Sequence, residues 1–134
     1  MTTSSYNQEF LVESVSLTLE FLSDIILDIH SIGEFNSGKE FFWNSKVTNL
    51  TSDISKFVEL TTLLSKLVMN RKKQTIPGIK ESHIHLLFIL KAMNQAHIKQ
   101  DYLALEELIK YELKDNLTQW KIDLIPQTRK LLNA

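Results

Sequence analysis

The chain has 134 residues, of which 43% are hydrophobic and 23% charged, and its formal net charge at pH 7 is −1. This length suits one domain with a full hydrophobic core, and the balanced charge argues against a nucleic-acid-binding protein. The lack of cysteine excludes disulfides, thiolate zinc sites and a cysteine nucleophile. Three glycines and two prolines are too few for a β-sandwich or β-barrel with many turns.

The first predicted helix spans about residues 6–30 and follows a short polar tail at residues 1–5. Apolar side chains share one face, and carboxylates follow the opposite face in steps of seven and four residues. The carboxylates are Glu13, Glu20, Asp24 and Asp28, and the apolar face comprises Leu11, Val15, Leu22, Ile26 and Ile29. Because four carboxylates interrupt the apolar stretch 10–32, we expect no membrane span; without a secretion signal, we expect a cytoplasmic protein.

Two further helices are predicted over about residues 39–69 and 83–99, the latter with Ser82 as its N-cap. In the later part of the 39–69 helix, the main apolar stripe is joined by a second one, formed by Leu60, Leu63 and Leu67. The segment 84–90 is apolar nearly all round. A helix that is apolar on two sides is usually covered on two sides, so we expect both segments to lie deep in the core.

The fourth predicted helix runs from Tyr102 to about Ile125, with Asp101 as its N-cap. Pro126 is expected to end or kink it, because proline lacks an amide hydrogen and disfavours helical geometry just before it, and a short extension follows. Four long helices with short connections predict a single all-α domain over residues 1–134, an antiparallel four-helix bundle with up-down-up-down topology. The predicted buried stripe of the fourth helix comprises Leu105, Ile109, Leu113, Leu117, Trp120 and Leu124.

Two patterns that are typical of ligand sites are incomplete in this chain. Residues 33–39 match the G-x-x-x-x-G-K part of a P-loop, but Glu40 stands where a Ser or Thr would bind magnesium, and the preceding segment reads as helix. His83 and His85 face away from each other on a helix, and His97 lies four turns from His83. We therefore expect no cofactor, no metal site and no catalytic residues.

Polar residues at the edge of the fourth helix's stripe need hydrogen-bond partners. Glu112 and Asn116 lie there, and one interpretation is a hydrogen bond between helices that sets their register. The functional alternative is a polar pocket around Glu112 and Asn116, with His85 as a third member, that binds a small ligand or supports catalysis. The sequence shows no second carboxylate or nucleophile beside them.

An apolar stripe on the first helix is the best indication of function. Phe10, Leu17 and Phe21 lie beside the acidic stripe, in steps of seven and four, and widen the apolar face beyond what one core contact needs. One interpretation is that neighbouring helices cover these side chains. The other is an exposed patch that binds a helix of another protein or a second copy of the chain.

The stretch 86–120 resembles known helical proteins. An apolar helix precedes Asp-Tyr, Leu-x-x-Leu-x-x-Tyr-Glu-Leu and a tryptophan, here Asp101, Tyr102, Leu105, Leu108, Tyr111, Glu112, Leu113 and Trp120. This pattern resembles a family of small uncharacterised bacterial helical proteins and implies no activity. Residues 94–96, Asp101, Glu106, Glu107 and Trp120 are also similar to the last helices of flagellin-type export chaperones, which implies a four-helix bundle with a chaperone role. The N-terminal Ser-Pro and Leu-Tyr-Asp-Gly signature of those chaperones is absent from the chain.

These observations predict a non-enzymatic protein-binding module, chaperone-like or adaptor-like, that recognises a partner protein through the apolar stripe of Phe10, Leu17 and Phe21. Two alternatives stay open. One is a small-ligand-binding or enzymatic bundle with a polar pocket around Glu112 and Asn116. The other is an obligate homo-oligomer in which the stripe is buried against a copy of itself.

Overall fold

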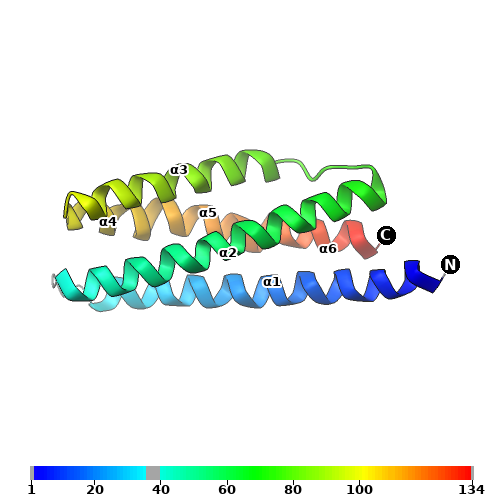
Figure 1. Cartoon of the computed structure of the whole chain (residues 1–134), viewed down its shortest axis with the longest axis horizontal. Coiled ribbons are helices and arrows are strands. Elements are labelled where there is room, and N and C mark those ends of the chain that lie inside the picture. Colours follow the sequence, from blue (N-terminus) through cyan, green and yellow to red (C-terminus); the bar gives the residue numbers. More distant parts are fainter. Residues whose placement is uncertain (1, 36–39, 134) are drawn as a thin grey trace.

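The computed structural model describes residues 2–35 and 40–133, which are almost entirely helical and contain no β-strand. The first three helices are α1 (Thr2–Phe35), α2 (Glu40–Lys72) and α3 (Ile79–Ile98). A fourth rod is built from α4 (Tyr102–Glu107), η1 (Leu108–Leu113), α5 (Lys114–Gln119), η2 (Trp120–Leu124) and α6 (Ile125–Asn133). Figure 1 shows these rods lying side by side, with each rod running back along the one before it.

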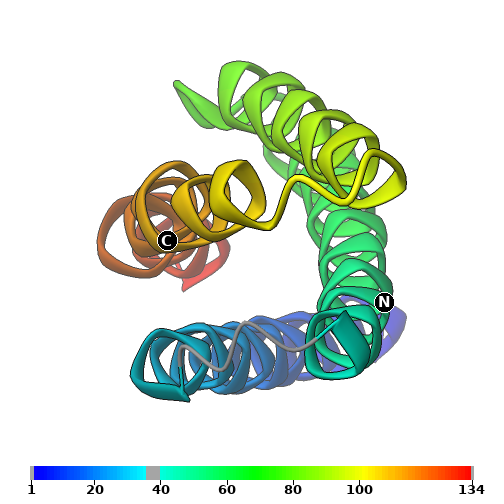
Figure 2. The same ribbon diagram turned by 90° about the vertical axis from the view of Figure 1, so that its left-hand side faces the viewer.

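The four rods surround a common centre when viewed along the long axis (Figure 2). In this view α2 lies between α1 and α3, and the fourth rod closes the ring between α3 and α1. The two ends of the described chain also meet, because the Gln8 side chain donates a hydrogen bond to the backbone carbonyl of Leu132. The fourth rod therefore holds the N-terminal part of α1.

Two helices begin earlier than the sequence predicts. α1 begins at Thr2, within the expected polar tail, and continues past Gly33 to Phe35. α3 begins at Ile79, so Ser82 lies inside its first turn and is not its N-cap. Gly78 takes that position with a φ of 91°, which glycine adopts without steric cost. The predicted cap of the fourth rod is confirmed, since the Ala104 amide donates to Asp101 Oδ1 over 3.2 Å.

The fourth rod contains two wide helical turns, η1 and η2, in which hydrogen bonds span five residues. The Lys114 amide donates to the Ile109 carbonyl, and the Ile125 amide donates to the Trp120 carbonyl. A step of four residues overshoots a full α-helical turn by about 40°, so apolar residues repeating at every fourth position drift away from the core. A π turn takes in one more residue and cancels this drift. The repeats kept buried in this way are Leu105, Ile109, Leu113 and Leu117, and Trp120, Leu124, Thr128 and Leu132.

Pro126 lies inside α6. The helix therefore does not end at Pro126, which was one of the two outcomes expected from the sequence. Proline lacks the amide hydrogen that the Ile122 carbonyl would need in a regular α-helix, where the proline ring would also clash with that carbonyl. The wide turn η2 directly precedes α6 and loosens the backbone at this place. The expected C-terminal extension is therefore the last part of one continuous rod, and Leu132 is fully buried in it.

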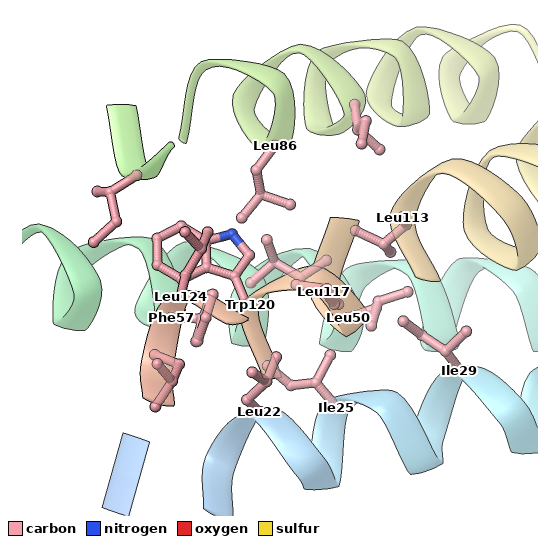
Figure 3. Packing of buried hydrophobic residues seen from close by; sticks show 14 of the residues in the cluster. Leu22, Ile25, Ile29, Leu50, Phe57, Leu86, Leu113, Leu117, Trp120 and Leu124 are labelled. Carbon is pink, nitrogen blue, oxygen red and sulfur yellow. The ribbon is translucent and has the colours of Figure 1, made fainter. Parts of the chain in front are cut away.

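The core runs the length of the molecule, and Trp120 is its largest fully buried side chain. Figure 3 shows Trp120 among leucines and isoleucines from all four rods. The Phe57 ring meets it edge-on, with ring centroids 5.4 Å apart. All six residues predicted for the buried stripe of the fourth helix are buried, which confirms that stripe.

The expected deep burial of α2's later part and of segment 84–90 is wrong. Leu60 and Leu63 of α2 are exposed, and so are Leu87 and Phe88 of α3. Each helix buries one apolar face against the centre, for example Phe57 and its neighbours on α2, and leaves its second apolar face uncovered within the described chain. No helix among residues 2–35 and 40–133 is both long and apolar enough to cross a membrane.

Candidate functional site

Helices α1 and α2 pack antiparallel, and two polar contacts define their register. Asp28 Oδ1 lies 3.7 Å from Lys46 Nζ toward one end. Toward the other end, Arg71 Nη2 donates to Gln8 Oε1 over 3.0 Å. Between these contacts, residues 8–28 of α1 run beside residues 71–46 of α2 in the opposite direction. This register places Leu17 level with Leu60.

The edges of α1 and α2 that face each other carry exposed apolar side chains. Phe10 and Leu17 on α1 are 55% and 57% exposed, and Leu60 and Leu63 on α2 are 38% and 52% exposed. On each helix these residues repeat at steps of three, four or seven, so they line one edge. We name this surface the apolar seam; it comprises Phe10, Leu17, Phe21, Leu60, Leu63 and Leu67.

Phe21 differs from the other two predicted contact residues on α1. It lies on the same edge of the helix, but its side chain is half-buried and packs against the core. Beyond Phe21 the seam becomes polar, as a shallow depression lined by Asp24, Asp28, Lys46 and Asp53. The structure therefore brings the three predicted residues onto one edge, while only Phe10 and Leu17 offer most of their surface to a partner.

The α1 side of the apolar seam is negatively charged. α1 contains no Lys or Arg, so all fifteen basic residues of the chain lie C-terminal to it. Its exposed carboxylates Glu13, Glu20 and Asp24 lie on the solvent side of Leu17, where they flank the seam along its length. A partner that carries positive charge beside apolar side chains would match both properties of this surface.

The predicted polar pocket is assembled only in part. Asn116 is buried, its Nδ2 donates to the Ser82 carbonyl over 3.3 Å, and it lies 3.2 Å from His85 Nδ1. Glu112 is exposed and does not line the shallow hollow beside Asn116, where Asp115 lies instead. Both residues directly precede a buried leucine, Leu113 or Leu117, but only Asn116 is itself buried there, where it reaches polar atoms of α3. The Asn116–Ser82 bond joins the fourth rod to α3, as the register interpretation predicts.

A groove between α2 and α3 could not be recognised from the sequence. It has a volume of about 500 Å³ and lies beside the loop from Lys73 to Gly78. His83 forms part of its wall, 2.6 Å from Thr61 Oγ1 through Nε2, with its ring 4.9 Å from that of Trp120. Burial lowers the pKa of His83 below its ordinary value of 6.5, because the surroundings disfavour the charged ring.

The lowered pKa of His83 predicts that acid destabilises the fold through this residue. The unfolded chain binds the proton more readily, so the contribution of His83 to stability is complete above pH 6.5 and is lost as the pH falls below it. We expect the free energy of unfolding, measured in urea at pH 7.5 and 5.5, to fall less in His83→Gln than in the wild type. The matched control His85→Gln alters an exposed ring and should keep the full difference; equal pH dependence in all three proteins would contradict the prediction.

The other sequence patterns gain no support as sites. The P-loop-like motif falls on residues 33–40, of which 36–39 lie outside the described residues. Within the described ranges, no three His, Asp or Glu side chains gather closely enough to hold a metal ion.

Comparisons of the chain with protein-family models, with curated proteins and with solved structures found no match. The resemblances carried by residues 86–120 therefore stay predictions, and function is argued from the surfaces described above.

Proposed function

We propose that this chain is a cytoplasmic, non-enzymatic protein-binding module that binds a basic amphipathic helix of a partner protein along the apolar seam. Its scaffold in this proposal is an antiparallel up-down-up-down four-helix bundle, supported by the alternating direction of successive rods (Figure 1). The single observation that carries the proposal is the line of exposed apolar side chains, led by Leu17 and Leu63, on the facing edges of α1 and α2.

A helix is the occupant that fits this shape. Two antiparallel helices leave a straight groove between them. A third helix can lie in this groove and contact it with apolar side chains at every third or fourth residue. Phe10 and Leu17 are seven residues apart, or about 10 Å along the axis at 1.5 Å per residue. Two turns of a partner helix would therefore span the exposed part of the seam on α1.

The charge pattern selects a basic partner over an acidic one. Carboxylates of α1 flank the seam, and the polar depression that continues it contains Asp24, Asp28 and Asp53 beside Lys46 and Lys56. Lys or Arg residues at the border of a partner's apolar stripe would meet these carboxylates, whereas Glu or Asp would be repelled. An adaptor or chaperone role would use such a surface to hold one segment of another protein.

The test uses two labelled peptides of about 18 residues, one with leucine and lysine and one with leucine and glutamate in the same amphipathic order. We expect the basic peptide to bind the full chain, as measured by fluorescence anisotropy, and the acidic peptide to bind far more weakly. The double substitution Leu17→Ser with Leu63→Ser should weaken binding about tenfold or more, because each exposed anchor contributes about 1 kcal/mol or more. Phe21 stays unchanged because it packs against the core.

The matched control is Leu103→Ser with Ile122→Ser, which removes two side chains of the fourth rod that are somewhat more exposed than Leu17 and Leu63. It should bind the basic peptide as the wild type does. Equal binding by the wild type and the seam variant would overturn the proposal. A dimer seen by light scattering in the wild type and lost in the seam variant would replace it with self-association.

A further inference from the structure

The groove between α2 and α3 has the shape and lining of a small-molecule site. Its volume of about 500 Å³ lies within the range of about 300–1,000 Å³ that is usual for ligand pockets. Apolar side chains from α2, the connecting loop and α3 form most of its lining, among them Val68, Ile76, Ile79, Ile84 and Leu87. The hydrocarbon chain of a small ligand could therefore lie along the groove and replace water there.

Polar and charged side chains also line the groove, although apolar side chains provide most of its surface. Ser65 contributes a hydroxyl that is buried without a hydrogen-bond partner among the described residues. Lys66 of α2 and Lys80 of α3 lie on opposite sides of the groove, and both residues are exposed. Glu81 is the one carboxylate in the lining, so cationic groups outnumber anionic ones.

We propose that this groove binds a small amphiphile with an apolar chain and a carboxylate head, of the fatty-acid type. The chain lies against Ile76, Ile84 and Leu87, and the carboxylate lies between the ammonium groups of Lys66 and Lys80. Ion pairs at such an exposed rim supply orientation more than affinity, and burial of the apolar chain supplies most of the binding free energy.

This site is independent of the protein-binding surface. Thr62, Ser65 and Lys66 lie on the edge of α2 that faces α3, whereas Leu60, Leu63 and Leu67 lie on the edge that faces α1. Substitutions in the groove can therefore be tested without altering the apolar seam.

Isothermal titration calorimetry with the full chain tests the proposal with three probes of equal chain length: decanoate, decanol and decyltrimethylammonium. We expect one saturable site that prefers decanoate to decanol and rejects the cation. Lys66→Glu with Lys80→Glu should weaken decanoate binding about tenfold and leave decanol binding unchanged. Thr62→Phe should block both probes by filling the groove, and Leu87→Glu is a second blocking variant if that chain does not fold.

Lys91→Glu is the matched control, because it reverses an exposed charge on α3 outside the groove lining. It should bind decanoate as the wild type does. No saturable decanoate binding, or equal affinity for all three probes, would overturn the proposal. Binding to anionic phosphatidylglycerol vesicles without binding to free decanoate would also overturn it, in favour of a lipid surface.

Discussion

Deletion of Tyr111 should leave the chain folded, whereas deletion of Ser55 should unfold it. Tyr111 is exposed and lies inside η1, where the turn already contains one residue more than an α-helix needs. Its removal shortens the step from Ile109 to Leu113 from four residues to three. A regular α-helix then keeps Leu105, Ile109, Leu113 and Leu117 on one face, because steps of four, three and four complete three turns.

Ser55 is also exposed, but it lies in a regular part of α2. Its deletion turns everything that follows in α2 by about 100° relative to what precedes it. Phe57, Leu64 and Val68 would leave the core together, and each large buried side chain contributes about 2–5 kcal/mol. The combined loss matches or exceeds the usual stability of a whole domain, about 5–15 kcal/mol.

Circular dichroism during thermal unfolding compares the two deletions directly. We expect a cooperative transition close to that of the wild type for the Tyr111 deletion, and no cooperative transition for the Ser55 deletion. If both deletions unfolded the chain, the wide turn would not hold a removable residue.

Substitution of Trp120 by alanine should cost about 3 kcal/mol of stability. The side chain is fully buried, packs edge-on against Phe57 and lies against His83, so its removal leaves a large cavity. The cost falls at the low end of the usual 3–5 kcal/mol, because the indole Nε1 has no hydrogen-bond partner among the described residues and its removal ends a desolvation penalty.

Urea unfolding of three variants measures this effect. Trp120→Phe keeps a ring in the same space without the N–H, and we expect it to cost less than about 1.5 kcal/mol. The surface control Ile122→Ala should lie within about 0.5 kcal/mol of the wild type. A Trp120→Ala protein as stable as Ile122→Ala would show that the rings around position 120 close the cavity at little cost.

The spacing of apolar residues predicted the buried faces well, because the residues that pack in the core recur with the period of the helix. The stripe from Leu105 to Leu124 is buried as predicted, and the Asp101 cap forms. The same stripe also contained the signal for the wide turns, since four-residue steps repeated along one helix cannot stay on one face of a regular α-helix. The signal becomes visible only when the rotation of each four-residue step is summed along the helix, because each step alone departs little from one full turn.

The second apolar stripes could not be interpreted in this way. The sequence shows that Leu60 and Leu63 are apolar, but what covers them depends on where neighbouring helices lie. The structure places them level with Leu17 on an open edge, so they extend the candidate binding surface instead of the core. The groove beside His83 could not be predicted from the sequence either, because it forms only where α2, the connecting loop and α3 come together.

The contact between Gln8 and Leu132 has a consequence for the order of folding during synthesis. The ribosome releases α1 and α2 before residues 125–133, which pack against both helices. Until then the buried faces of α1 and α2 have only part of their neighbours, and the nascent chain exposes aggregation-prone apolar surface. Closure of the bundle therefore waits for α6, and a nascent chain that lacks α6 would present both the unfinished core and the apolar seam to chaperones.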